Sequence, residues 1–331
     1  MHITDKGYAT RFDKIILDLR RDTYMRIIRN GEKDSVKKAV ALGNFDGIHI
    51  AHTVVINNCR KYAEENAIES SVFLFRNHTL NCIENRKVNL ITDESEKLEI
   101  LSELGVDSVY ITDFDENIRK MTPEEFVKML IDTLNPCAVF AGYDYRFGYK
   151  AEGDINTLIE LGKEYGFDVV VTDEMKIKGE PVKSTKIRQL IADGEIYEAN
   201  KYLGRPFSVT GKVVSGFQNG RTIGIPTANV EYSKCKLLPK NGVYMGYTTV
   251  RGKSFKSVIN VGANPTIAAK KITVESHILD FNADIYGKII KVEFIERIRD
   301  EITVKNLSEL KEQIKKDIEI AENEFSHRED K

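Results

Sequence analysis

The sequence predicts an α/β domain with a doubly wound parallel sheet, followed by a small antiparallel β-barrel with a C-terminal helix. Three observations support this fold class. The chain of 331 residues is longer than one typical domain core. Strand-like and helix-like segments alternate from about residue 36 onward. After Arg205-Pro206 the pattern changes to short alternating strands separated by glycine-rich turns. We therefore expect domains at 25–204 and 205–331, with residues 1–24 as either a mobile extension or an added strand.

The first domain is predicted to contain five strands joined by helices. The predicted strands are 36–43, 70–75, 107–114, 136–142 and 167–174, and the predicted helices between them are 52–66, 93–105, 122–134 and 154–166. Thr122 is a good N-cap, and Pro123 and Glu125 complete a capping box. Gly105 is a predicted C-cap. Helical patterns continue through 184–194 and 195–204.

The second domain is predicted to be all-β until its last segment. The predicted strands are 207–216, 242–250, 253–262, 271–281 and 288–298. Residues 306–325 place apolar side chains on one helical stripe, namely Leu307, Leu310, Ile314, Ile318 and Ala321. We expect this segment to be a helix packed on the barrel.

Composition excludes several classes of protein. The net charge of −2 gives no general reason to bind nucleic acid or anionic membranes. The sequence contains no run of eighteen or more apolar residues, so we expect no segment to span a bilayer. The first residues also lack the pattern of a secretory signal. The four scattered cysteines show no metal-ligand spacing, so we expect reduced thiols in a cytoplasmic protein.

The stretch LGNFDGIHIAH, residues 42–52, follows a predicted strand and opens a predicted helix. Unpaired backbone N–H groups at a helix start favour phosphate. His49 and His52 stand three residues apart and could share one face. A structural or surface role for the two histidines is the alternative. The carboxyl ends of parallel strands are where such sheets bind ligands, so this turn is a candidate nucleotide site.

Two further segments are expected to converge on the same edge. Asp144 and Arg146 lie in the loop AGYDYRFG after the strand 136–142. Ser184, Thr185 and Arg188 lie at the start of the helix in KSTKIRQL. Hydroxyls, free amides and a guanidinium suit a triphosphate, although each could also be an ordinary cap or surface residue.

The stretch SGFQNGRTIGIPTANV, residues 215–230, is the more specific signal. Its glycines at 216, 220 and 224 permit tight turns and close approach of phosphate. Thr227 and Asn229 alternate onto one side of a strand, where a hydroxyl and an amide can share a hard cation. A glycine-rich hairpin with polar edges is the alternative.

In order and spacing, GNFDGIHIAH, GYDYRFG and STKIR resemble the nucleotidyltransferase domain of bacterial bifunctional riboflavin kinase/FMN adenylyltransferase. SGFQNGRTIGIPTANV, NGVY, NVGANPT and VESHILDF are similar to the kinase domain of the same family. The resemblance covers roughly residues 25–325. It implies small-molecule partners only (riboflavin, FMN and ATP), Mg²⁺ as cofactor, and a monomer or weak homo-oligomer.

For the first domain, the resemblance implies attack of the FMN phosphate on the α-phosphorus of ATP. His49 and His52 would contact the ATP phosphates, and Ser184, Thr185 and Arg188 would hold phosphates too. The nucleotide pocket would be lined by Asn44, Phe45, Asp46 and Gly47. His78, Asp144 and Arg146 would form the flavin side.

For the second domain, the resemblance implies phosphorylation of riboflavin to FMN. Glu275 would be the general base, and Thr227 and Asn229 would bind Mg²⁺ with ATP. Around them, ATP and flavin would contact Gly216, Gly220, Arg221, Gly224, Pro226 and Arg299.

The first domain departs from the family pattern at four positions. Ala51 replaces a glycine, Asn77 and Thr79 replace two prolines around His78, and Lys183 replaces a serine. A methyl group in a close backbone–ligand approach costs about 1–3 kcal/mol. Two alternatives therefore stand beside the bifunctional enzyme: a riboflavin kinase whose adenylyltransferase is inactive or weakened, and a regulatory protein that binds flavin or nucleotide.

Overall fold

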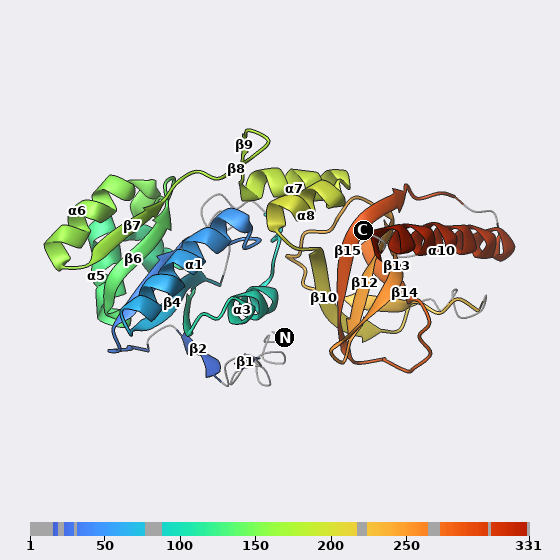
Figure 1. Ribbon diagram of the computed structural model, residues 1–331, viewed down its shortest axis with the longest axis horizontal. Coiled ribbons are helices and arrows are strands. Elements are labelled where there is room, and N and C mark those ends of the chain that lie inside the picture. The colour runs from blue at the N-terminus through green and yellow to red at the C-terminus, as the bar shows by residue number, and fades with distance from the viewer. Residues whose placement is uncertain are drawn as a thin grey trace, which may run out of the picture. The chain divides into compact units, whose positions relative to one another are not determined.

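The computed structural model describes residues 16–18, 23–29, 32–76, 88–216, 224–263, 272–303 and 306–329 (Figure 1). The chain divides into two compact units, Met1–Val182 and Lys183–Lys331, each built around its own β-structure.

The first unit carries a seven-stranded sheet in the order β1-β2-β5-β4-β3-β6-β7. The strands from β2 to β7 run parallel, and β1 pairs antiparallel with β2. Their bounds are β1 (Ile16–Asp18), β2 (Thr23–Arg29), β3 (Lys38–Leu42), β4 (Glu69–Phe75), β5 (Ser108–Thr112), β6 (Pro136–Gly142) and β7 (Asp168–Thr172). The predicted parallel sheet is confirmed, and β2 is a further parallel strand that the sequence pattern did not indicate.

Helices cover both faces of this sheet (Figure 1). They are α1 (Ile50–Glu65), α3 (Glu94–Glu103), α4 (Glu116–Lys120), α5 (Pro123–Leu134) and α6 (Ile155–Tyr165), with a 3₁₀ turn at Tyr149–Ala151 and a short hairpin of β8 (Lys176–Ile177) and β9 (Glu180–Pro181). Side chains of a strand alternate between faces. Ala39 and Ala41 pack in the core with α1 and α3, while Val40 and Leu42 pack in the core with α5 and α6.

Local sequence signals set the helix ends. Thr122 and Glu125 form the predicted capping box, and Asp93 and Glu96 form a second one at the start of α3. Gly105 follows α3 with a φ of 74°, a left-handed conformation that glycine adopts without strain.

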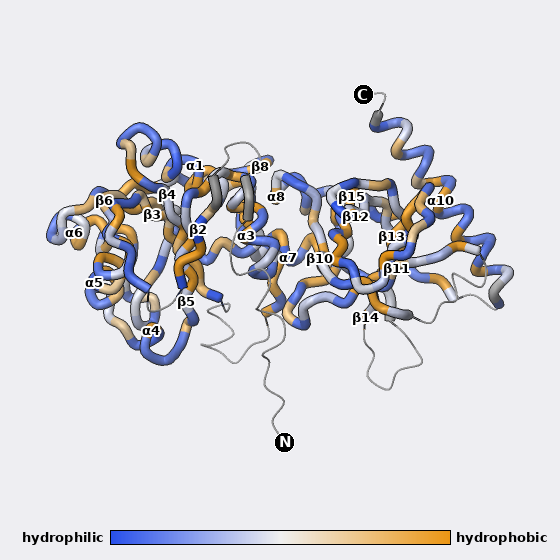
Figure 2. Tube along the Cα trace, turned by 90° about the horizontal axis from the view of Figure 1, so that it is seen from below, coloured by the Kyte–Doolittle hydropathy of each residue, from blue (hydrophilic) through white to orange (hydrophobic). Residues whose placement is uncertain are grey.

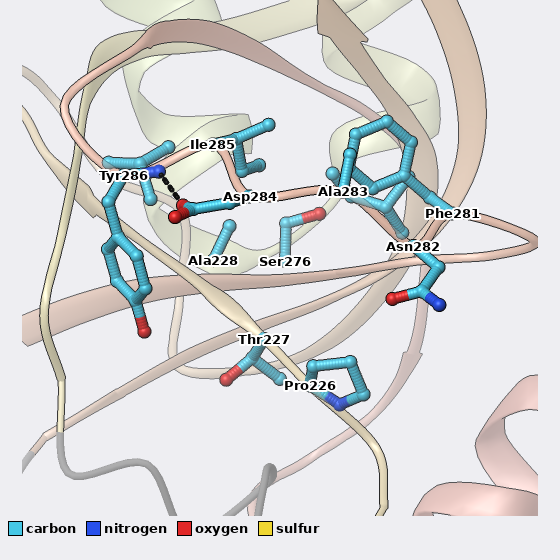
Figure 3. A pocket seen from close by; sticks show the side chains of 12 residues that line it. Pro226, Thr227, Ala228, Ser276, Phe281, Asn282, Ala283, Asp284, Ile285 and Tyr286 are labelled. Atoms are coloured by element: carbon cyan, nitrogen blue, oxygen red, sulfur yellow. Dashed lines mark hydrogen bonds between the residues drawn. The ribbon is translucent and has the colours of Figure 1, made fainter.

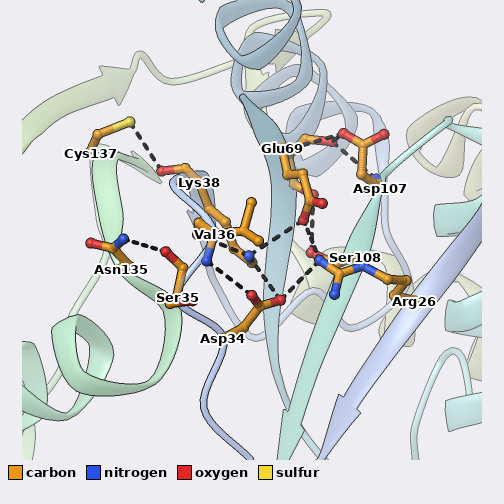
Figure 4. Close-up of polar contacts among 11 residues, drawn as sticks. Arg26, Asp34, Ser35, Val36, Lys38, Glu69, Asp107, Ser108, Asn135 and Cys137 are labelled. Atoms are coloured by element: carbon orange, nitrogen blue, oxygen red, sulfur yellow. Dashed lines mark hydrogen bonds and ion pairs between the residues drawn. The ribbon is translucent and has the colours of Figure 1, made fainter. Parts of the chain in front are cut away.

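A buried lysine lies at the amino end of β3 (Figure 4). The side chain of Lys38 is fully buried, and its Nζ lies 3.0 Å from the carboxylate of Asp34 and 3.4 Å from that of Glu69. Arg26 donates hydrogen bonds to both carboxylates from the solvent side. The two cations and two carboxylates form a compact network at the sheet edge opposite to LGNFDG.

The second unit contains a closed barrel in the strand order β10-β11-β14-β13-β12-β15. All its pairings are antiparallel, as predicted. The strands are β10 (Phe207–Val214), β11 (Ala228–Glu231), β12 (Gly242–Val250), β13 (Lys253–Ala263), β14 (Ile272–Ile278) and β15 (Ile289–Arg299); the helices are α7 (Ser184–Asp193), α8 (Ile196–Leu203) and α10 (Leu307–Glu329).

Helices α7 and α8 belong to the same compact unit as the barrel. The side-chain amide of Asn200 donates to the carbonyl of Phe294 at 2.9 Å and accepts from the N–H of Phe207 at 2.7 Å. The N–H of Lys240 donates to the carbonyl of Ile191. These contacts explain a structural division at 182/183. The domain boundary after residue 204 stays a prediction.

Helix α10 packs one side on the barrel. Ala321 and Phe325 are buried against Val243, Met245 and Val258. Figure 2 shows hydrophobic positions recurring along a largely hydrophilic helix, as an amphipathic surface helix requires. Within the described ranges, no helix is both long enough and apolar enough to cross a membrane.

Candidate functional site

In the first unit, the turn after β3 lies at the point where the strand order reverses. The chain builds outward from β3 through β4 to β5, then returns to place β6 on the other side of β3. Leu42 of β3 pairs with Ala141 of β6. The carboxyl ends of these strands therefore flank a topological switch point, where open α/β sheets bind ligands.

The backbone of this turn is held in an unusual conformation. Phe45 and Ile48 have φ values of 44° and 36°, and Gly47 has 87°. Left-handed backbone is unfavourable for Phe and Ile, so surrounding contacts must impose it. Both side chains are buried in the core under α1, which anchors the turn.

The segment before α3 clamps the turn from outside. The carboxylate of Asp46 accepts hydrogen bonds from the N–H groups of Ile91 and Thr92. Thr92 in turn accepts at Oγ1 from the N–H of Gly47 at 3.0 Å. The buried Lys97 donates from Nζ to the carbonyl of Asn44 at 3.4 Å. Asp46 is thus directed at backbone amides, and we call these contacts the 91–97 clamp.

His49 and His52 lie together at the start of α1. His49 is the N-cap, and its Nδ1 accepts the N–H of His52 at 3.3 Å. The two rings stack with centroids 3.5 Å apart, and Phe45 meets His52 edge-on. An accepting Nδ1 leaves the proton of a neutral His49 on Nε2, which can donate to an anion.

In the second unit, Thr227, which directly precedes β11, faces Glu275 of β14. Thr227 donates from Oγ1 to Oε2 of Glu275 at 3.2 Å, and Thr273 donates to Oε1 at 3.5 Å. Burial raises the pKa of Glu275, while the two hydroxyl groups act in the opposite direction. A carboxylate with a raised pKa is a stronger proton acceptor when ionised, which suits a general base.

Asn229 lies beside this pair, since it occupies the register position opposite Glu275. A Cβ atom on Gly216 would lie 2.3 Å from Nδ2 of Asn229, so any other residue there would displace the Asn229 side chain. Gly224 has a φ of 80° and open space around it, so its backbone conformation, not its surroundings, favours glycine.

Two cavities meet at Thr227. One has a volume of about 280 Å³ and is lined by Glu275, Asn260, Arg299 and residues of α10. The other, of about 410 Å³, is lined by Pro226 and Ser276 and by the loop Phe281–Tyr286 (Figure 3). Thr227 lines both. A reaction between two bound molecules can therefore take place at this shared wall.

Arg299 joins the smaller cavity to α10. Its Nε and one terminal nitrogen each lie 2.7 Å from the carboxylate of Asp317, a bidentate pair. Gln313 also donates to Asp317 at 3.0 Å. The guanidinium is thereby fixed at the cavity wall, and α10 is fixed to β15.

Comparison with known proteins identifies the family. The family model for FAD synthetase matches residues 31–186, and that for riboflavin kinase matches residues 203–325. The bifunctional riboflavin kinase/FMN adenylyltransferase of Listeria monocytogenes is 32% identical over 306 residues, which cover 92% of this chain and 97% of that protein. The chain belongs to this family.

A second relative carries the same family name, and a solved structure shares the fold. The Escherichia coli K12 protein with the same family name is 36% identical over 289 residues, 86% of this chain and 92% of that protein. A crystal structure described as a macrolide-efflux protein from Streptococcus pneumoniae superposes with a TM-score of 0.83 at 30% identity, covering 90% of this chain and 99% of that one. The fold of both units is therefore shared over nearly the whole chain.

The roles predicted for the other residues of the adenylyltransferase-like unit stay predictions. Asp144 is exposed in the loop after β6. Arg146 is also exposed and lies 3.6 Å from Asp154, the N-cap of α6. Ala51 is half-buried in the first turn of α1. Asn77, His78 and Thr79 lie outside the described residues, as do Gly220 and Arg221 of the kinase unit.

Ser184, Thr185 and Arg188 lie in the first two turns of α7, which belongs to the second unit. Lys183 is the N-cap and makes no capping hydrogen bond from its side chain. The phosphate-binding role of these residues stays a prediction.

Sequence reasoning missed several residues of both sites. Asn260 pairs in register with Glu275. His277 lies two residues after Glu275, on the same face of β14. Both lie inside stretches already singled out, NVGANPT and VESHILDF, so a face-by-face reading of those strands could have found them. Thr92, Lys97 and Asp317 reach their sites only through tertiary packing, and no local pattern indicates them.

Proposed function

We propose that this chain phosphorylates riboflavin to FMN and then transfers an adenylyl group from ATP to FMN, giving FAD. The observation that carries the kinase half is the Thr227–Glu275 hydrogen bond at the wall between two cavities. The relatives' name joins the same two activities, and the chain matches the family models of both domains.

In the kinase unit, the cavity that contains Glu275 takes riboflavin, because a general base must contact the proton that it removes. The larger cavity then takes ATP. Glu275 accepts the proton of the ribityl 5′-hydroxyl as its oxygen attacks the γ-phosphorus, and ADP leaves. Arg299, fixed by Asp317, borders the riboflavin side.

The Thr227 hydroxyl and the Asn229 amide are oxygen donors of the kind that Mg²⁺ accepts alongside phosphates. They lie on one side of β11, next to Glu275. When bound, Mg²⁺ would neutralise charge on the transferred phosphoryl group. Both residues would hold it together with ATP.

In the adenylyltransferase unit, ATP lies over the turn at the switch point. Nε2–H of His49 and the N–H groups that open α1 donate to its phosphates. His52 stacks on His49 and holds its ring in place. A phosphate oxygen of FMN attacks the α-phosphorus, and pyrophosphate leaves. Positioning and charge neutralisation suffice for this transfer, with no covalent intermediate.

The test separates the products of the two reactions. The purified chain is incubated with riboflavin, ATP and Mg²⁺, and FMN and FAD are separated by chromatography. We expect both products. FMN without FAD would support the alternative of a kinase with an inactive adenylyltransferase, and binding without any product would support a regulatory protein.

Two variants assign the sites. Glu275→Gln should stop FMN formation and still convert supplied FMN into FAD. His49→Ala should do the reverse. Phosphorylation that is unaffected by Glu275→Gln would refute the assigned base. The predicted cytoplasmic location and monomer or weak homo-oligomer stay predictions.

A further inference from the structure

The segment Pro226–Thr227 lies just beyond the end of a β-ladder. Strand β11 pairs with β14 through Val230–Val274, Asn229–Glu275 and Ala228–Ser276. Pro226 has no N–H to donate to a neighbouring strand. Side chains of β14 can hold this segment where the ladder ends.

Two side chains of β14 do so. Glu275 accepts from the Thr227 hydroxyl, and Nδ1 of His277 lies 2.8 Å from the carbonyl oxygen of Pro226. Glu275 and His277 are two residues apart, so they project from the same face of the strand. Pro226 and Thr227, which are consecutive, are thus held by His277 and Glu275, which are alternate residues of β14.

The partner of His277 fixes its protonation pattern. A carbonyl oxygen only accepts hydrogen bonds, so Nδ1 must carry a proton. The neutral ring then has an unprotonated Nε2.

The contact also joins the walls of the two cavities. Pro226 lines the larger cavity, where it stands beside Thr227 (Figure 3). His277 lines the smaller one with Glu275. The hydrogen bond therefore crosses the wall at which the phosphoryl group would pass.

We propose that His277 is a positioning residue for riboflavin phosphorylation, which holds Pro226 so that Thr227 stays aligned with Glu275 between the two substrates. The inference rests on the proposed kinase function. It assigns no proton transfer to His277.

The test compares two replacements with opposite hydrogen-bonding capacity. His277→Phe keeps a planar ring but has no donor, while His277→Asn places an amide N–H near the position of Nδ1. We expect His277→Phe to lower kcat for FMN formation about 10- to 100-fold, because misplaced reacting groups cost rate. The KM for riboflavin should change less than about threefold, since the flavin cavity keeps its other walls. His277→Asn should recover kcat to within about threefold of wild type.

Controls separate positioning from folding. The same replacement at the exposed His327 of α10 should change nothing. FAD formation from supplied FMN by His277→Phe reports an intact chain. Equal loss of both activities, or failure of His277→Asn to recover kcat, would mean a merely structural role and overturn the inference.

A spectroscopic readout is independent of activity. The ¹⁵N spectrum of histidine-labelled wild-type protein should show Nδ1 protonated and Nε2 unprotonated at His277. The opposite tautomer would overturn the inference, because an unprotonated Nδ1 cannot bond to a carbonyl. If the wild-type chain forms no FMN from riboflavin and ATP, the proposed kinase function is overturned instead.

Discussion

Glu275 serves the proposed reaction at the expense of stability. Burial raises its pKa, so the folded chain binds the proton more tightly than the unfolded chain. The free energy of unfolding therefore falls as the pH rises from the ordinary Glu pKa through the raised value. At neutral pH the ionised, buried carboxylate therefore gives a lower free energy of unfolding than its protonated form would.

Glu275→Gln should consequently be inactive as a kinase yet at least as stable as wild type at pH 7. The amide removes the buried charge and can still accept from Thr227. Thermal unfolding at pH 7 and pH 4 measures this, and any gain should shrink at the lower pH. A clear loss of stability at pH 7 would show that the ionised carboxylate is stabilising. For FMN formation by the wild type, kcat/KM should fall in acid with an apparent pKa above the ordinary Glu range.

Lys38 is buried at the amino end of β3, at the sheet edge opposite to LGNFDG, so we expect it to contribute to stability. Lys38→Met removes a fully buried cation from Asp34 and Glu69 but leaves Arg26 bound to both. Breaking a buried pair costs about 3–5 kcal/mol, and we expect the low end here because Arg26 remains. Denaturant unfolding measures the loss. Lys37→Met, at the exposed neighbouring position, is the matched control and should have little effect.

The pH dependence of the Lys38 variant follows from Asp34. Partial burial acts to raise its pKa, but the hydrogen bond and charge of Lys38, with Val36 N–H and Arg26, lower it on balance. A carboxylate whose pKa is lowered by folding stabilises the folded state at pH values above the ordinary Asp pKa. This contribution is lost as the pH falls through the folded-state pKa. The difference between wild type and Lys38→Met should therefore narrow in acid. A constant difference would exclude Asp34 as its source.

At the scale of elements, the 91–97 clamp connects α3 to the turn between β3 and α1. The sequence predicted α1 and α3 with their ends within about two residues of those observed. It gave no indication that Asp46 would bond to amides 45 residues away, because hydrogen bonds between loops depend on how the strands are ordered. The same reason hid Asp317 as the partner of Arg299.

Thr92→Val tests the clamp. Valine keeps the shape of threonine but cannot accept the N–H of Gly47, so this buried hydrogen bond is lost. We expect kcat/KM for FAD formation from FMN to fall about 10- to 100-fold as the nucleotide turn loosens. FMN formation from riboflavin should be unchanged.

Thr133→Val is the matched control for the clamp. Its hydroxyl bonds to a carbonyl within α5, so FAD formation should be preserved. Unaltered FAD formation by Thr92→Val would show that the turn keeps its form without this contact.

At the scale of the whole molecule, the pattern of apolar segments was enough to predict a parallel sheet followed by a closed barrel. It was not enough to assign every segment to its unit. Strand β2 lies in a mostly polar region whose pairing with β5 is non-local. Helices α7 and α8 continue the helical pattern of the first unit, yet Asn200 and Ile191 bond to the barrel.

The division of residues between the units leads to a complementation prediction. Glu275 and Thr227 lie in the second unit, and the turn with His49 lies in the first. Each single variant should thus lose one reaction and keep the other. A mixture of Glu275→Gln and His49→Ala chains should then make FAD from riboflavin, because FMN released by one chain is adenylylated by the other.

The measurement is a time course of FMN and FAD in the mixture at two protein concentrations. FMN should appear first, and FAD should follow after a lag that shortens as the concentration of the Glu275→Gln chain rises. A lag of this kind requires FMN to pass through solution. If the His49→Ala chain yields at most one FMN per chain and the mixture makes no FAD, FMN is not released, and transfer must occur within one chain.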